Sequence, residues 1–190
     1  RLAKVFQWAK DRHLFEGNSP TDRVLEILKD KHPQQASENR KALPWQDAPI
    51  FIKKIHKQTH RSLAVRLMLE FVILTGCRTK EARLAEWSEI DLRKKTWSIP
   101  RERLKTRKTF PWAEWRIPLS ARCLEILAEV KRLPNTTDLI FPGVTYQGST
   151  RANSANAMLD LRKVMGYGNT LDIHGFRSTL NTWTQEYEHS

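Results

Sequence analysis

The chain has 190 residues, and its 33 lysines and arginines exceed its 21 aspartates and glutamates by 12, which gives a formal net charge of +12. With 39% apolar residues it can bury a core, and no apolar run approaches the roughly 20 residues of a membrane span, so a disordered chain and a spanning protein are both excluded. Such a basic excess attracts polyanions, above all nucleic acid, with an anionic membrane surface as the main competing partner.

The first part of the chain predicts two short helices followed by a linker. Apolar residues at helical spacing from Leu2 to Ala9 predict the first helix, and a second is predicted from about Thr21. Residues 32–44 are polar and lack periodicity, which is typical of a linker between domains. We therefore expect one domain to end near residue 31 and another to cover residues 45–190.

The next part predicts helices and then a hairpin. Helices are predicted over residues 48–58, 61–74 and 79–87, and the second is so apolar that it should lie at the centre of the core. Residues 96–99 and 116–119 alternate between apolar and polar side chains and predict two strands. The long segment between them makes the hairpin tip.

The last part returns to helices. Ser120 is a good N-cap for a helix that ends before Pro134, and residues 138–143 predict a buried extended segment. Two further helices are predicted over residues 152–165 and 174–188. The predicted fold class is therefore mainly α with a small antiparallel β-sheet (α+β).

Motifs for cofactors and metals do not occur in this sequence. Neither G-x-G-x-x-G nor G-x-x-x-x-G-K-[ST] is present, which excludes the usual nucleotide-binding loops. Cys77 and Cys123 stand alone, without the close pairs that zinc sites use or the even, spaced set of a secreted scaffold. We expect no metal, no cofactor and a reducing, cytoplasmic location.

Two basic motifs lie where a phosphate could bind. Arg78 lies in a turn at the start of a predicted helix, where free backbone N–H groups and a guanidinium favour an anion. The alternative is a plain surface ion pair between Arg78 and Glu81. His174 and Arg177, at i and i+3, share one helix face, and the alternative there is a packed, hydrogen-bonded histidine.

A third basic segment forms the tip of the predicted hairpin. Residues 101–108 hold five basic side chains and one acidic side chain. A charge run is usually a solvated face, but a hairpin tip of this length can also reach a DNA groove or phosphates.

Together these segments resemble a tyrosine recombinase of the phage and genomic-island integrase type. The resemblance is carried, in order, by TGCRTKEARLAEWSEIDLRKKTWSIPRERLKT, RIPLS, LIFPG and DIHGFRSTL, and it extends from about Pro44 to the end. It implies a tyrosine-recombinase catalytic domain over residues 45–190, incomplete at its C-terminus. It also implies that residues 1–31 are the last helices of the preceding core-binding domain and that residues 32–44 are the linker.

The resemblance also implies roles for individual residues. It makes Arg78, Lys105, His174 and Arg177 catalytic, with Glu81 as the supporting acid. The two arginines would stabilise the phosphate oxygens, and Lys105 would protonate the leaving 5′ oxygen. His174 would handle the nucleophile's proton or hold a phosphate oxygen. The predicted DNA-binding residues are Arg101, Arg103, Arg107 and Lys108.

The implied activity is site-specific recombination. A protein of this family cuts and rejoins double-stranded DNA at attachment sites through a 3′-phosphotyrosyl intermediate, without metal or ATP. The implied setting is a prophage or mobile element in the bacterial nucleoid, with self-association on DNA into a tetramer of the full enzyme.

Two features depart from the family pattern. The nucleophilic tyrosine is expected well beyond the H-x-x-R pair, whereas Tyr187 follows Arg177 by only ten residues on the same predicted helix. We therefore interpret Tyr187 as a core or interface residue, and expect the 190-residue chain to lack the nucleophile and to be inactive alone. Trp115 stands just before the R-I-P-L strand, where relatives often carry histidine.

Two rival interpretations remain. The chain could be a non-catalytic DNA-binding remnant or accessory module, or a strand transferase like the type IB topoisomerases. A downstream Gly-His followed by a tyrosine in the full reading frame would favour the recombinase.

Overall fold

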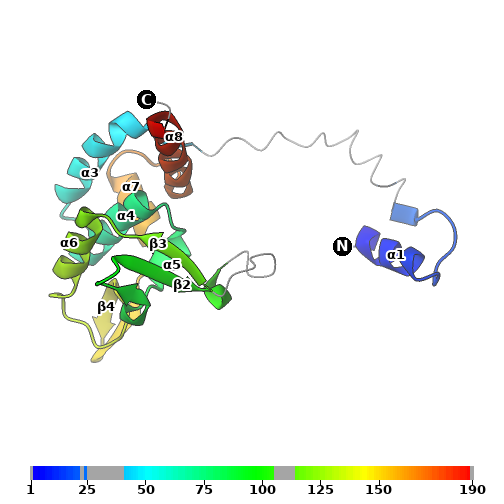
Figure 1. Cartoon of the computed structure of the whole chain (residues 1–190), viewed down its shortest axis with the longest axis horizontal. Helices are drawn as coiled ribbons and strands as arrows, with labels where there is room; N and C mark the ends of the chain where they lie inside the picture. The colour runs from blue at the N-terminus through cyan, green and yellow to red at the C-terminus, as the bar shows by residue number, and fades with distance from the viewer. Residues whose placement is uncertain (1, 22–23, 25–40, 105–113, 189–190) are drawn as a thin grey trace. The chain divides into compact units, whose positions relative to one another are not determined.

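The computed structural model describes residues 2–21, 24, 41–104 and 114–188 (Figure 1). The chain divides into two compact units, Arg1–Asn39 and Arg40–Ser190. In the first unit, helix α1 (Leu2–Asp11) confirms the predicted N-terminal helix. The rings of Phe6 and Phe15 meet edge to face with 5.2 Å between their centroids.

The second unit is built around helix α4 (Leu63–Thr75), as the sequence predicts (Figure 1). Ten of its 13 residues are buried, and Ser62 caps its start by accepting a hydrogen bond from the backbone of Val65. Five helices contact α4, namely α3 (Ala48–His56), α5 (Thr79–Arg83), α6 (Ala121–Val130), α7 (Ala157–Val164) and α8 (Phe176–Glu188).

A buried carboxylate joins three of these helices. Glu70 of α4 accepts hydrogen bonds of 2.8 and 3.1 Å from the Arg122 guanidinium of α6. The His56 Nε2 atom of α3 lies 3.0 Å from the same carboxylate. A charge taken out of water is tolerated only when it is paired, so Glu70 can interrupt the apolar run of α4 because these partners surround it.

A three-stranded antiparallel sheet packs on the same core. Its order is β1 (Ile90–Asp91), β2 (Thr96–Pro100) and β3 (Glu114–Pro118). Both predicted strands are confirmed, and the short β1 was not predicted. In the β2–β3 register, Trp97 lies opposite Ile117 and Ile99 opposite Trp115. Trp97 is fully buried and contacts Phe71 of α4, with 5.4 Å between ring centroids.

Two predicted helices are shorter than expected because residues expected at one end of each form β-pairs instead. Helix α5 ends at Arg83 rather than near residue 87, since Glu86 forms a β-bridge with Leu139. Helix α7 begins at Ala157 rather than 152. The preceding residues form β5 (Ser149–Ala152), which pairs with β4 (Pro142–Tyr146) in a separate ribbon.

Short 3-10 turns connect these elements, namely η1 (Trp45–Asp47), η2 (Trp87–Glu89), η3 (Arg101–Arg103) and η4 (Ile173–Gly175). The predicted fold class, mainly α with a small antiparallel sheet, is confirmed. Within the described residues, no helix has the length and apolar character that crossing a membrane requires.

Candidate functional site

The site is organised by a tight turn at the end of α4. Gly76 caps this helix in the left-handed region, at φ +59°, which other residues rarely adopt. A Cβ atom at this position would lie 2.7 Å from Cδ2 of Leu180 on α8. The turn therefore brings α8 close and carries the chain directly to Arg78 at the start of α5.

Arg78 is held by the acid three residues later. The backbone N–H of Arg78 donates to Glu81 Oε2 over 2.7 Å, and its Nη1 donates to Oε1 over 2.8 Å. The Glu81 side chain is almost fully buried, whereas 23% of the Arg78 side chain is exposed. The backbone contact fixes the Glu81 carboxylate and the Nη1 contact orients the guanidinium, so the ion pair considered from sequence is present at the start of α5.

Arg177 comes to the same turn from the other end of the sequence. On α8, its Nη1 donates to the Gly76 carbonyl over 2.7 Å. Burial and the nearby Arg78 charge lower the pKa of Arg177 from its ordinary value, and Glu81 opposes this shift. Two cations and one carboxylate thus surround Gly76, and the excess positive charge favours an anion.

His174 lies one turn before Arg177, on η4. Its backbone N–H donates to Asp172 Oδ1 over 3.2 Å, which caps this turn. The segment of residues 41–43 supports it, because the Lys41 carbonyl accepts a hydrogen bond from the Asp172 N–H over 2.8 Å. The structure therefore fixes the backbone of His174 next to the helix that carries Arg177.

Replacing Gly175 with alanine should destabilise the packing of residues 41–43 against η4. A Cβ atom there would lie 2.5 Å from the Lys41 carbonyl oxygen and 3.0 Å from Ala42 Cα, and both are backbone atoms that cannot move alone. We expect a loss of about 2 kcal/mol in the free energy of unfolding, measured by urea denaturation. Gly168→Ala is the control, since its Cβ would meet only the Lys163 side chain at 3.4 Å or more and backbone at 3.8 Å. Equal losses in both variants would contradict the close packing at Gly175.

The hairpin base is tied to α5 by Arg103. Its Nη2 donates to the Glu81 carbonyl over 2.7 Å, and its Nη1 pairs with Glu89. Glu89 also accepts a hydrogen bond of 2.9 Å from the Trp97 indole. These contacts engage both terminal nitrogens of the guanidinium, so Arg103 supports the base of the hairpin. Its expected contact with DNA stays a prediction. Arg101 begins the same turn.

Other predicted residues of the hairpin lie outside the described residues, namely Lys105, Arg107 and Lys108. Tyr187 lies on α8 together with Arg177, as predicted. It is 70% exposed and stacks on Trp183 with 5.5 Å between ring centroids, so its interpretation as a core residue is wrong, while the alternative of an interface residue stays a prediction.

Three contacts at the site were missed by sequence reasoning. They are the Gly76 carbonyl that accepts from Arg177, the inward turn of Arg103, and the Trp115 ring of β3, whose centroid lies 5.6 Å from the Arg177 guanidinium carbon. Alternation along β3 places Trp115 on the same face as the buried Ile117. No signal in the sequence says which helix that face meets.

Cys77 lies within the turn and is fully buried. Burial, with a further contribution from Glu81, raises the pKa of its thiol to about 12, so the thiol is neutral at neutral pH. We expect no reaction with a maleimide at pH 8 unless the protein unfolds, tested in a Cys123→Ser variant. Rapid labelling of the folded variant would contradict the burial of Cys77.

Because the pKa of the Cys77 thiol is raised in the folded protein, its contribution to the free energy of unfolding should be constant below about pH 9. This contribution should fall as the pH rises from about 9 towards 12.

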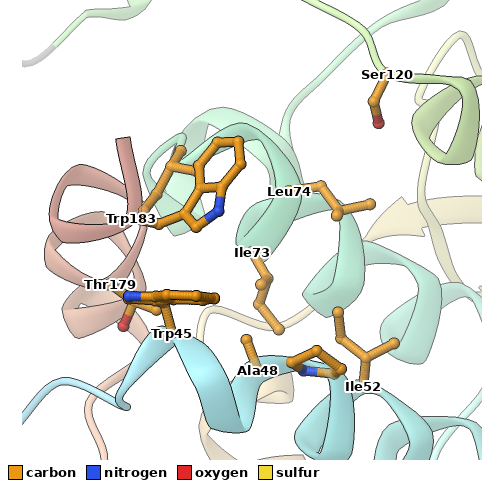
Figure 2. A pocket seen from close by; sticks show the side chains of 10 residues that line it. Trp45, Ala48, Ile52, Ile73, Leu74, Ser120, Thr179 and Trp183 are labelled. Carbon is orange, nitrogen blue, oxygen red and sulfur yellow. The ribbon is translucent and has the colours of Figure 1, made fainter. Parts of the chain in front are cut away.

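Helix α8 also borders an apolar pocket of about 450 Å³. Figure 2 shows Trp45 and Trp183 at one end of it, with Ile73 and Leu74 of α4 nearby. None of the residues that line it carries a charge. This pocket is therefore unsuited to a phosphate, in contrast to the cations around Gly76.

Comparison with known proteins gives consistent results for sequence and fold. The sequence model of the phage integrase family matches residues 43–188. The chain is 33% identical over 150 residues to the putative protein IntB of Escherichia coli K12, covering 74% of this chain and 37% of that protein. It is 26% identical over 189 residues to the integrase of Enterobacteria phage P4, covering 94% of this chain and 41% of that protein. The chain thus spans about two fifths of the length of these relatives.

Solved structures share the fold. The Tn1549 transposon integrase in complex with circular intermediate DNA matches 98% of this chain and 64% of its own, with a TM-score of 0.62 and 11% identity. The XerH recombinase bound to a palindromic difH substrate matches 81% of this chain and 45% of its own, with a TM-score of 0.57 and 20% identity.

Proposed function

This chain belongs to the phage integrase family, and from that membership we propose that it supplies the catalytic domain of a tyrosine recombinase. The observation that carries the proposal is the pair of arginines at the Gly76 turn, drawn together from α5 and α8. In the proposed layout, residues 45–190 are this domain, residues 32–44 the linker and residues 1–31 the end of a core-binding domain.

In the proposed reaction, a DNA phosphate lies between Arg78 and Arg177. Attack on a phosphodiester builds negative charge on its nonbridging oxygens, and two fixed guanidiniums stabilise that charge. Glu81 holds Arg78 in place for this role. His174 assists at the nucleophile or at a phosphate oxygen, and Lys105 protonates the leaving 5′ oxygen.

The proposed partner is double-stranded DNA at attachment sites, with further copies of the protein assembled on it. The proposed contacts with the DNA backbone come from the hairpin and are made by Arg101, Arg107 and Lys108. Arg103, also proposed to contact DNA, in addition supports this hairpin through its contacts with Glu81 and Glu89.

Strand cleavage by the full-length gene product tests this proposal. The substrate is a nicked duplex with the sequence that this product selects from a random library. A covalent protein–DNA band that survives denaturation supports the recombinase. Tight DNA binding without any such band would instead favour the non-catalytic DNA-binding module.

Binding of the 190-residue chain to duplex DNA should depend steeply on salt. If about six phosphates are neutralised, the logarithm of the binding constant should fall against the logarithm of salt concentration with a slope near −5, measured by fluorescence anisotropy. Arg107→Ala and Lys108→Ala should each make the slope shallower by about one. Lys53→Ala, an exposed change on α3, is the control and should leave it unchanged. Binding that is insensitive to salt would contradict the proposal.

A further inference from the structure

Arg177 lies where a guanidinium is difficult to hold. It is partly buried, and Arg78 repels it from the same turn. Glu81, the carboxylate among the electrostatic partners of Arg177, already accepts two hydrogen bonds from Arg78. Within the described parts of the chain, the Gly76 carbonyl is the one acceptor to which the Arg177 guanidinium donates.

Trp115 is the remaining contact that favours the charge. The guanidinium carbon lies over its ring, 5.6 Å from the centroid. This is within the range of a cation–π interaction. The ring is partly buried against the core, and β3 holds it by pairing with β2, where Ile99 lies opposite. The strand therefore presents the indole at a fixed position.

An aromatic ring and a carboxylate differ in how many N–H donors of a guanidinium they leave available for another ligand. A carboxylate neutralises the guanidinium and takes its in-plane N–H donors, which are the groups that bind phosphate in a fork. A ring stabilises the cation through the negative face of its π system and carries no charge that would neutralise it, so the cation can still bind an anion. Arg177 has five N–H donors, of which one is given to Gly76.

We infer that Trp115 is a positioning residue whose ring stabilises the Arg177 cation without neutralising it, and so leaves N–H donors of Arg177 for a DNA phosphate. This inference rests on the proposed function of the site. It assigns a role to Trp115, the residue just before the R-I-P-L strand.

A double-mutant cycle on the 190-residue chain tests the inference. Binding to a 30-base-pair duplex of mixed sequence is measured at low salt for Trp115→Leu, Arg177→Ala and the double variant. We expect Trp115→Leu to weaken binding about three- to tenfold when Arg177 is present, and to have no effect after Arg177→Ala. Trp115→Phe, which keeps an aromatic ring, should restore most of the loss.

Trp87→Leu is the matched control. Its ring also lies near a cation, with Lys131 Nζ 5.7 Å from the centroid, and it also packs against the core. This change should leave DNA binding unaltered in both Arg177 backgrounds. The aromatic ring should shift the Nε–H proton resonance of Arg177. We expect this ring-current shift to be lost in Trp115→Leu and kept in Trp115→Phe. A change in protein stability alone would not produce this pattern.

The possible outcomes distinguish a failure of this inference from a failure of the proposed function. If Arg177→Ala leaves DNA binding unchanged, the proposed function of the site fails, and the inference fails with it. If Arg177→Ala weakens binding but Trp115→Leu has the same effect in both backgrounds, the inference is overturned and the function stands.

Discussion

Replacing Arg177 with alanine should lower the rate of DNA strand cleavage by about 10²- to 10³-fold, as removal of one donor to a transition-state oxyanion does in other enzymes. DNA binding should weaken by about tenfold or less, because many phosphates contribute to it. The reason is that charge on the phosphate oxygens grows in the transition state, so a guanidinium between Gly76 and Trp115 contributes more there than in the bound substrate.

Measurement uses the full-length gene product on its nicked substrate, with adduct formation followed over time. Arg177→Lys keeps one positive charge but loses the planar fork, so its cleavage rate should lie between those of the alanine variant and the wild type. Arg132→Ala, an exposed arginine after α6, is the control and should cleave normally. Equal losses in binding and cleavage would show that Arg177 acts only in DNA binding.

Replacing Arg103 with alanine should lower the free energy of unfolding by about 3 kcal/mol. The Glu89 side chain is only 8% exposed and would be left without its cation, while the Glu81 carbonyl would lose a donor. For a unit of this size the loss corresponds to a fall in Tm of about 6 to 12 °C, measured by calorimetry.

A compensating change separates the ion pair from simple packing. In Arg103→Leu combined with Glu89→Gln, no charge is left unpaired, and the glutamine can still accept from the Trp97 indole. We expect this double variant to be more stable than Arg103→Ala. A loss below about 1 kcal/mol for Arg103→Ala would place this contact among ordinary surface ion pairs, and the hairpin base would not depend on it.

Local signals in the sequence were sufficient to predict many of the helices and strands of this protein. The apolar run of α4, the Ser120 cap of α6 and the alternation of β2 and β3 each act within a few residues, and all are confirmed. Helix ends were less predictable. Helix α5 stops early because Glu86 pairs with Leu139, a partner 53 positions further along the chain.

The order of the motifs also identified Arg78, Glu81, His174 and Arg177 as candidates, since a family pattern preserves residue types and spacing. The pairing of Arg78 with Glu81 follows from their spacing in the sequence, but what surrounds Arg177 was decided by the tertiary structure alone. Caps and helical hydrogen bonds are satisfied within about four residues, so a sequence can reveal them. The acceptor for Arg177 lies 101 positions away, and its aromatic partner comes from another strand, because the packing of α4, α8 and β3 sets both.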